Sequence, residues 1–554
     1  MKTVTRRFLL LATLLAALVA AACGSGSGSP GDSQDAAPGD APAGVAEPGT
    51  PTQGGTLRLA LYNDPPDLDV QLAGQRNKHI PAQLIHDVLV RRHPETGELV
   101  PGLLARWDVT DDGLVWTLEL KPGMTFPSGR PVTAEDLKAV WERALDPEFV
   151  TSYARNRLGP VSEMVVKDEL TLEVHFSEPF APFLDALTDY ALSPIDMETV
   201  AQYGDEYPRH PAGLGPYRFV SWTAGSSIRL ERNPDYRWAP EFYENRGAPY
   251  PDAVEFSIIP EYGTRRNAFL AGELDILEIE NVADIEMLQQ DPRFEVISVT
   301  TDRVASLDLN TAKAPTDDVL VRRALNYAVD REPLAAMYGP GARPSCGPLS
   351  PASFGYWKGI EAEGVCYRYD PEKAAELLDS AGWTLGADGW RSKNGQRLKV
   401  VLGTIQSDIF MRQAQLVQAQ LQEIGVEVEI VTLEAGAYAA WRIEGNHNLA
   451  FNHEIGLDPD PRYTSFHSSV AGVGRNFAHY RNPRMDELLE TQRRVVDLEE
   501  RAAIWEEIQK LFIEDAIWLP IHTVPTHLAY NRERGAGFHA SPYGEFYHDV
   551  WLKQ

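Results

Sequence analysis

Residues 398–433 read LKVVLGTIQSDIFMRQAQLVQAQLQEIGVEVEIVTL and carry the clearest fold signal of the chain. Their two ends, 398–403 and 426–433, are short runs of aliphatic and β-branched residues, which is typical of strands. From about 410 to 424, apolar side chains recur at three- and four-residue intervals, as they do on one face of a helix. A strand, a helix and a second strand in succession predict an α/β unit.

Helical patterns continue on both sides of this unit. Residues 317–338 and 370–382 each open with Asp, whose carboxylate can accept the free backbone N–H groups of a helix start. Residues 484–514 form a long amphipathic stretch with a break near Asp497. A strand is expected at 518–521, and short irregular segments are expected after it.

The first half of the chain is rich in hairpin patterns. From Gly54 on, apolar residues alternate with others, as in a half-buried strand. Thr133 with Asp136 predicts the N-terminus of a helix that reaches Leu145. The expected strand pairs lie at 107–109 with 116–120 and at 215–222 with 227–232.

The N-terminus has the layout of a secretory signal, which we assign to residues 1–22. Basic residues precede an apolar core at 8–19, and three alanines lead directly to Cys23. This core is shorter than the roughly 20 residues that a membrane-spanning helix needs. Cys23 is therefore expected to carry lipid, with an ordinary cleavage site as the alternative because Ala20 stands where lipoprotein signals usually have Leu. Sec and twin-arginine export both stay open.

Amino-acid composition and length limit which structures and binding partners the rest of the chain can have. Residues 23–53 are nearly all small or polar, so they cannot bury enough apolar area to become ordered, and a tether is expected there. The remaining roughly 500 residues are too many for one core and favour two or three domains. The net charge of −29 opposes contact with nucleic-acid phosphates, so nucleic-acid binding is not expected.

Cys346 and Cys366 are the only cysteines besides Cys23. Thiols of an exported protein meet an oxidising environment. A disulfide between the two is predicted, and two unpaired buried thiols are the alternative.

A series of short motifs follows the tether over nearly the whole chain. They are PGLLA at 101–105 before Trp107, DG at 112–113, GLGPY at 213–217, ERNPDY at 231–236, RRALNYAVDR at 322–331, YDPEKA at 369–374 and DPDP at 458–461. Taken in this order, the motifs resemble those of the oligopeptide-, dipeptide- and nickel-binding proteins of ABC importers, which form family 5 of the extracytoplasmic solute-binding proteins.

The resemblance implies an α/β, two-lobed fold like that of periplasmic binding proteins (type II, cluster C), with an extra inserted domain. Lobe I would combine 54–95, 205–305 and 523–554, the inserted domain would span 96–204, and lobe II would span 306–522. Segments that cross between the lobes are expected near 306–310 and 519–522.

The implied partners are a small solute, with an oligopeptide as the leading expectation, and the permease and ATPase subunits of an ABC importer. The two lobes would close over the solute, and the permease would recognise this closed state. The protein is expected to act outside the cytoplasm as a monomer without a cofactor, anchored to the cell membrane by its lipid. A non-peptide ligand, such as an oligosaccharide or a metal chelate, and a sensing lipoprotein without transport are the alternatives.

The resemblance also points to ligand-contacting residues after residue 450. In peptide-binding relatives an aspartate three positions before an acidic-Pro pair accepts the peptide's amino group, and counting from Asp460 that place is Leu457. A one-residue shift would give the role to Asp458. Glu454 falls where relatives often carry Trp, and with Asp458 and Asp460 it could line an anionic pocket. Both aspartates could equally be turn formers beside proline.

Four aromatic residues, Trp441, Tyr463, Tyr356 and Trp357, are candidate walls of the ligand site, although each could instead serve in packing. The scattered histidines lack the spacing of a zinc site, so no metal is expected. The chain has no phosphate-binding glycine loop and no nucleophile motif, so binding without catalysis is favoured over a secreted hydrolase.

Overall fold

The computed structural model of the chain describes residues 49–72, 76–149, 153–362 and 364–553. The predicted signal peptide, Cys23 and most of the predicted tether therefore lie outside the described residues. Residues 50–554 form one compact unit. Within the described ranges, no helix has both the length and the apolar character that crossing a membrane requires.

The α/β unit predicted from residues 398–433 is confirmed. It belongs to a six-stranded sheet in which β16 (Lys399–Ile405) and β17 (Glu427–Leu433) run parallel, joined by α11 (Asp408–Glu423). The helix buries Ala414, Val417 and Leu421, which recur on one face, against a core that also contains the strand residues Val400 and Leu402. The strand order is β11, β19, β12, β18, β16 and β17.

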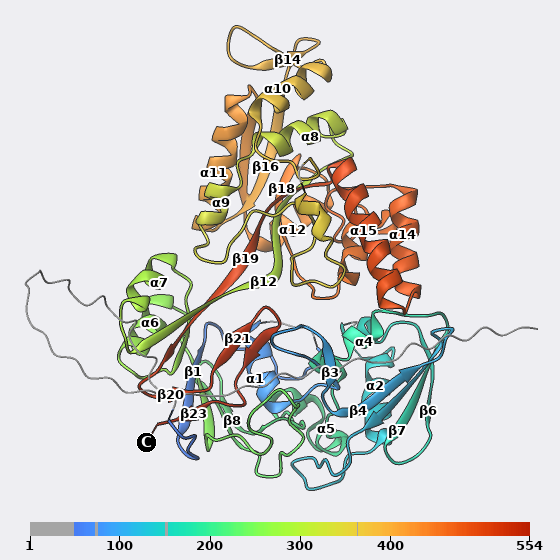
Figure 1. Cartoon of the computed structure of the whole chain (residues 1–554), viewed down its shortest axis with the longest axis vertical. Helices are drawn as coiled ribbons and strands as arrows, with labels where there is room; N and C mark the ends of the chain where they lie inside the picture. The colour runs from blue at the N-terminus through green and yellow to red at the C-terminus, as the bar shows by residue number, and fades with distance from the viewer. Residues whose placement is uncertain (1–48, 73–75, 150–152, 363, 554) are drawn as a thin grey trace, which may run out of the picture. The chain divides into compact units, whose positions relative to one another are not determined.

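Two long strands of this sheet pair with each other in the antiparallel direction. These are β12 (Phe294–Leu309) and β19 (Trp518–Asn531), and Figure 1 shows them side by side. Their first shared section pairs 294–300 with 525–531, next to β11 (Ile276–Glu278). Their second section, where 304–309 also pairs with β18 (Leu449–Glu454), lies beyond a register break between Thr300 and Val304. The lobe boundaries expected from the sequence stay a prediction.

The C-terminal end of the chain differs from the sequence expectation. The strand predicted at 518–521 continues to Asn531, because its backbone finds partners on both β12 and β11. The segments expected to be irregular after it contain four short strands. They are β20 (Gly535–Ala536), β21 (His539–Ser541), β22 (Gly544–Phe546) and β23 (Trp551–Leu552). Strands of two or three residues carry too little pattern to be recognised locally.

The hairpins predicted in the first half are confirmed in two four-stranded sheets. One sheet has the order β1 (Thr56–Leu61), β10 (Ala253–Ile258), β9 (Ser227–Arg232) and β8 (Tyr217–Thr223). The other has the order β4 (Leu104–Val109), β5 (Val115–Leu120), β7 (Thr171–Phe176) and β6 (Val161–Val166). Helix α2 (Ala134–Leu145) begins at Thr133, whose backbone N–H donates to Asp136 Oδ2 at 2.9 Å, as the sequence predicted.

The predicted helical stretches of the second half are also present. Residues 317–338 contain α8 (Val319–Ala328) and α9 (Glu332–Ala336), and 370–382 contains α10 (Pro371–Ser380). The stretch 484–514 forms α14 (Pro483–Arg494) and α15 (Leu498–Asp515), and Asp497 at the predicted break accepts a hydrogen bond from the Glu500 N–H. The sequence thus locates both the helices and the break.

The remaining elements connect these sheets and helices. The helices are α1 (Arg76–Ile85), α3 (Tyr153–Leu158), α4 (Phe183–Ala186), α5 (Met197–Tyr203), α6 (Tyr262–Leu270), α7 (Val282–Gln289), α12 (Ala435–Ile443) and α13 (Tyr463–Phe466). The strands are β2 (Val90–Arg92), β3 (Leu99–Pro101), β13 (Thr384–Leu385), β14 (Arg391–Lys393) and β15 (Gln396–Arg397). A disulfide joins Cys346 to Cys366 across the loop between α9 and α10.

Candidate functional site

The candidate ligand residues lie where β18 ends and the chain turns toward α13. The buried Arg462 fixes the shape of this turn, because its guanidinium donates to Ile455 O at 2.7 Å and to Pro348 O at 3.2 Å. Leu457 is half-buried, and its carbonyl oxygen accepts a hydrogen bond from Phe354 N at 2.7 Å. The segment is therefore attached to the loop that precedes it by about a hundred residues.

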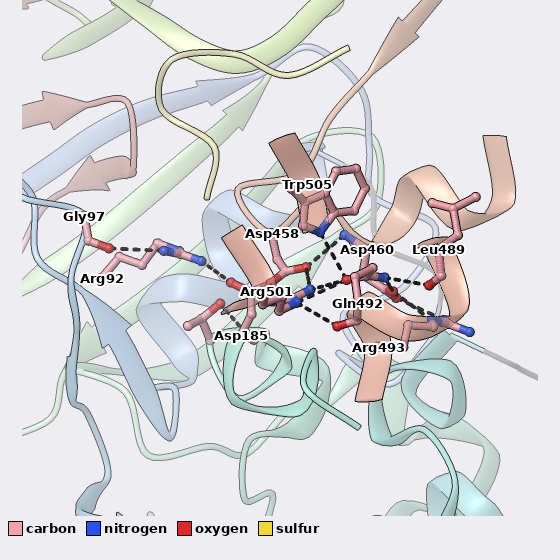
Figure 2. Close-up of polar contacts among 11 residues, drawn as sticks. Arg92, Gly97, Asp185, Asp458, Asp460, Leu489, Gln492, Arg493, Arg501 and Trp505 are labelled. Carbon is pink, nitrogen blue, oxygen red and sulfur yellow. Dashed lines mark hydrogen bonds and ion pairs between the residues drawn. The ribbon is translucent and has the colours of Figure 1, made fainter. Parts of the chain in front are cut away.

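Asp458 is buried and forms an ion pair with Arg501 of α15. Arg501 Nη1 lies 2.5 Å from Asp458 Oδ2, and Nη2 lies 2.7 Å from Oδ1, so the guanidinium engages both carboxylate oxygens (Figure 2). Burial alone would raise the pKa of Asp458, but the charge and hydrogen bonds of Arg501 outweigh burial and hold this pKa below its usual value. The negative charge of Asp458 is thus already neutralised within the protein.

Asp460 is paired in the same way with α14. Its carboxylate accepts hydrogen bonds from Arg493 Nε at 2.8 Å and Nη2 at 3.0 Å, and from Gln492 Nε2 at 2.9 Å. Gln492 Oε1 in turn accepts from Arg501 and from Trp505 Nε1, at 2.9 and 3.1 Å (Figure 2). The two aspartates therefore fasten the 458–460 turn to α14 and α15. Asp460 N also donates to Asp458 Oδ1 at 2.8 Å, which is the turn-forming contact that Asp-Pro sequences favour.

A second charged pair, Arg92 with Asp185, lies beside these groups (Figure 2). Arg92 also donates to Gly97 O at 3.1 Å. Burial raises the pKa of Asp185; Arg92 opposes the rise, and the negative charge of Asp458 adds to it. The segment before Asp185 contacts the end of α14 directly, because Ala181 N donates to Arg493 O at 2.6 Å.

Glu454 is almost fully buried at the end of β18. All three of its hydrogen bonds go to Oε1, from Asn452 Nδ2 at 3.2 Å, Ser465 Oγ at 2.9 Å and the half-exposed Arg475 at 3.4 Å. Within the described chain no donor reaches Oε2. Glu454 therefore keeps one carboxylate oxygen available for a further donor.

Asp308 of β12 lies next to Glu454 and was not among the residues singled out from the sequence. Asn452 Nδ2, which also bonds Glu454, donates to Asp308 Oδ1 at 3.3 Å. Burial raises the pKa of Asp308 to about 7. The charge of Arg442, whose Nη1 lies 4.0 Å from Asp308 Oδ2, lowers this pKa, and the negative charge of Glu454 raises it further. The structure thus places two buried carboxylates around one amide.

The four aromatic candidates are half-buried, and each has a packing partner. Tyr463 stacks on His467 at 4.4 Å between ring centroids and lies under the guanidinium of Arg493. Trp441 packs closely over Gly403, where an added Cβ would lie 2.3 Å from the indole.

The other two aromatic candidates lie in the loop before α10, next to α15. Tyr356 donates to Glu361 Oε1 at 2.5 Å. Trp357 lies under the Lys510 ammonium, and its backbone N–H donates to Gln509 Oε1 at 3.3 Å. The structure therefore brings Asp458, Asp460 and Tyr463 together, but places Trp441 on α12 in a separate packing environment. The ligand-binding roles of all these residues stay predictions.

Arg501 is the most consequential residue that the sequence reasoning missed. A signal for it exists, because Arg501 shares the buried face of α15 with Trp505, Ile508 and Phe512 at helical spacing. A charged residue on an apolar face must find a partner inside the protein. The sequence gives no indication, however, that this partner is Asp458.

Comparisons with known proteins place the chain in a family. Residues 98–475 match the family model described as "Bacterial extracellular solute-binding proteins, family 5 Middle". The probable di/tripeptide-binding protein 5 of Pseudomonas aeruginosa is 29% identical over 523 residues, which cover 89% of this chain and 95% of that protein. Heme-binding protein A of Haemophilus influenzae is 28% identical over 492 residues, covering 84% and 86% of the two chains.

A solved structure supports the same assignment. The periplasmic binding protein DppA of Helicobacter pylori, in complex with the peptide STSA, is 27% identical and aligns with a TM-score of 0.73, covering 91% of this chain and 99% of that one. The predicted two-lobed α/β fold is thereby confirmed. The family consists of substrate-binding receptors rather than enzymes. The chain belongs to the bacterial extracellular solute-binding proteins of family 5.

Proposed function

We propose that this protein is an oligopeptide-binding receptor of an ABC importer, held at the outer face of the cell membrane by lipid on Cys23. The observation that carries the proposal is the likeness to a binding protein solved with a bound peptide, over nearly the full length of both chains. The di/tripeptide-binding relative supports the same ligand class. The peptide is the cargo, which the receptor would pass unchanged to the permease and its ATPase.

We assign the closing motion to the two long strands β12 and β19. Their ladder is interrupted between Thr300 and Val304, so residues 301–303 lack the backbone partners that stiffen the strands on either side. A few residues at the end of a paired section can absorb the rotation of a hinge. Lobe I at 54–95, 205–305 and 523–554 would then close on lobe II at 306–522, with 96–204 as the inserted domain.

Among the predicted acidic contacts, Glu454 is better placed than Asp458 to receive a ligand ammonium group. Both oxygens of Asp458 are taken by Arg501, whereas Glu454 Oε2 has no donor in the described chain. We therefore propose that Glu454 binds the amino group of the peptide.

A non-peptide cargo is the second candidate. The heme-binding relative is nearly as similar to this chain as the di/tripeptide-binding one. The neutral, half-buried Leu457 at the place counted for the amine-binding aspartate also favours this alternative.

Native mass spectrometry of the protein from residue 50 on, followed by release of whatever copurifies, tests the ligand class. Peptides are expected. A released heme, sugar or chelate, together with no stabilisation by a peptide panel in thermal unfolding, would overturn the peptide proposal.

The role of Glu454 is tested by comparing free and N-acetylated peptides in calorimetric titrations. Glu454→Gln should reduce the preference for the free amine by about tenfold or more, because a charge-assisted hydrogen bond is lost. The exposed Glu444→Gln is the control and should leave that preference unchanged. If wild type, Glu454→Gln and Glu444→Gln all prefer the free amine to the same extent, Glu454 does not bind the amino group.

The lipid anchor is tested separately in membranes. Cys23→Ala in the full chain should abolish fatty-acid labelling and release the protein from the membrane fraction. Labelling that persists in this variant would contradict lipidation at Cys23.

A further inference from the structure

At the register break between β12 and β19, one arginine has no counter-ion among the described residues. Arg303 lies in the section 301–303 that is not paired with β19, and its side chain is half-buried. Within the described chain its guanidinium makes no hydrogen bond or ion pair, and its backbone N–H donates to Thr301 Oγ1 at 3.2 Å. Every other buried or half-buried arginine whose side chain the structure describes has a guanidinium hydrogen bond or ion pair.

Strand register identifies the groups that share a face with Arg303. Ala305, two residues further along β12, pairs with His453 of β18 and with His522 of β19. Side chains two residues apart on a strand share a face, and the charge of Arg303 acts to lower the pKa of both His453 and Tyr338, which places Arg303 beside this face. Tyr338 packs on that face, with its ring centroid 4.3 Å from that of His522.

Two of these neighbours also have polar groups without partners. His453 Nε2 is enclosed and has no hydrogen bond, and the Tyr338 hydroxyl has none within the described residues. Burial, and then the charge of Arg303, lower the pKa of His453 to about 3, so this ring is neutral. Burial raises the pKa of Tyr338 to about 12, which keeps its hydroxyl protonated and able to donate.

The acidic groups nearest in sequence have other partners. Glu454 pairs with Val304, one residue from Arg303, and is bonded to Arg475. Asp302 is occupied by the backbone N–H of Gly456, which donates to its Oδ2 at 2.7 Å. Among the described residues no carboxylate forms an ion pair with Arg303, although a partly desolvated cation is stabilised by one.

We propose that Arg303, with the Tyr338 hydroxyl and His453, forms a subsite that binds a carboxylate group of the transported ligand at the register break between β12 and β19. The guanidinium offers a planar pair of donors that matches a carboxylate, and the phenol adds a third donor. The inference rests on the proposed receptor function but commits only to the anionic group, whether it comes from a peptide C-terminus or from a non-peptide acid.

Calorimetric titration of tripeptides with free or amidated C-termini tests the subsite in the peptide case. Wild type should bind the free-acid tripeptide more tightly than the amide. Arg303→Gln should lower the affinity for the free acid by about 10- to 100-fold and leave the affinity for the amidated tripeptide little changed. Tyr338→Phe should cause a smaller loss of the same kind. Arg246→Gln, which removes an exposed arginine of the loop between β9 and β10, is the charge-matched control and should behave as wild type.

Acetate, the carboxylate group alone, provides a second probe that does not depend on peptide binding. Replacing chloride by acetate at constant ionic strength should raise the unfolding temperature of wild type and of Arg246→Gln, but not that of Arg303→Gln. If no peptide binds and this difference persists, the peptide proposal fails and the subsite stands. If Arg303→Gln keeps the wild-type preference for the free acid, or if it responds to acetate as wild type does, the subsite is overturned.

Discussion

Replacing Arg501 by Met should strongly destabilise the protein, because Asp458 would stay buried without a counter-ion. Asp458 is 5% exposed and Arg501 2% exposed, and two hydrogen bonds join them. Removing one partner of such a buried pair costs about 3–5 kcal/mol, whereas exposed ion pairs contribute about 0–1 kcal/mol. Met has a similar length, so the variant removes the charge and the hydrogen bonds to Asp458 and Gln492 without leaving a large cavity.

Urea unfolding of the protein from residue 50 on, at pH 7, measures this cost. The matched control is Arg484→Met on α14, which removes an exposed arginine paired with Glu487 and Glu507 and should cost about 1 kcal/mol or less. The double variant Asp458→Asn/Arg501→Met should lose less free energy of unfolding than the sum of the losses of the two single variants, because it leaves no buried charge without a partner.

The cost should also depend on pH in a defined direction. The folded-state pKa of Asp458 lies below its unfolded value, so the pair's contribution is present above the unfolded pKa and is lost as pH falls through the folded pKa. The difference between wild type and Arg501→Met should therefore shrink from pH 7 toward pH 3. A deficit below about 1 kcal/mol at pH 7, or one that does not change with pH, would refute the reasoning.

Asp308→Asn should become stabilising relative to wild type as pH rises from about 4 to about 7, because the raised folded-state pKa of Asp308 makes its charged form costly. Urea unfolding across this pH range measures the difference, with the exposed Asp205→Asn as the control. A difference between Asp308→Asn and wild type that does not change with pH would contradict the reasoning. Removing the disulfide with Cys346→Ser/Cys366→Ser should cost about 3 kcal/mol, since a loop of this length is then free in the unfolded chain. Equal stability of oxidised wild type and the double variant would contradict that estimate. Gly403→Ala should lower the unfolding temperature by several degrees, because the new methyl group meets the indole that packs over it; an unchanged temperature would mean that α12 shifts without cost.

Local patterns were sufficient for much of the fold. The α/β unit at 398–433, the helix start at Thr133 and the break at Asp497 were all predicted from residues close in sequence. They could be, because helix periodicity and N-terminal capping depend on side chains within a few positions of one another. The order of motifs then indicated the family.

The candidate site was predictable only in part. The resemblance pointed to the acidic residues Glu454, Asp458 and Asp460, but their chemical state depends on which distant groups reach them. Arg501 lies 43 residues from Asp458 in the chain and is brought to it only by the packing of α15. Burial is likewise invisible in the sequence, although it raises the pKa of Asp308 to about 7.

The sequence by itself determined the class of the fold, most of its regular elements and the family, because these follow from short-range periodicity and from motif order. Only the tertiary structure decided that β19 extends to Asn531, that Asp458 is already neutralised and that Arg303 has no counter-ion among the residues described. The physical reason is the same in each case. The length of a strand depends on which backbone it pairs with, and the state of a buried charge depends on its counter-ion. In each case that partner lies far away along the chain.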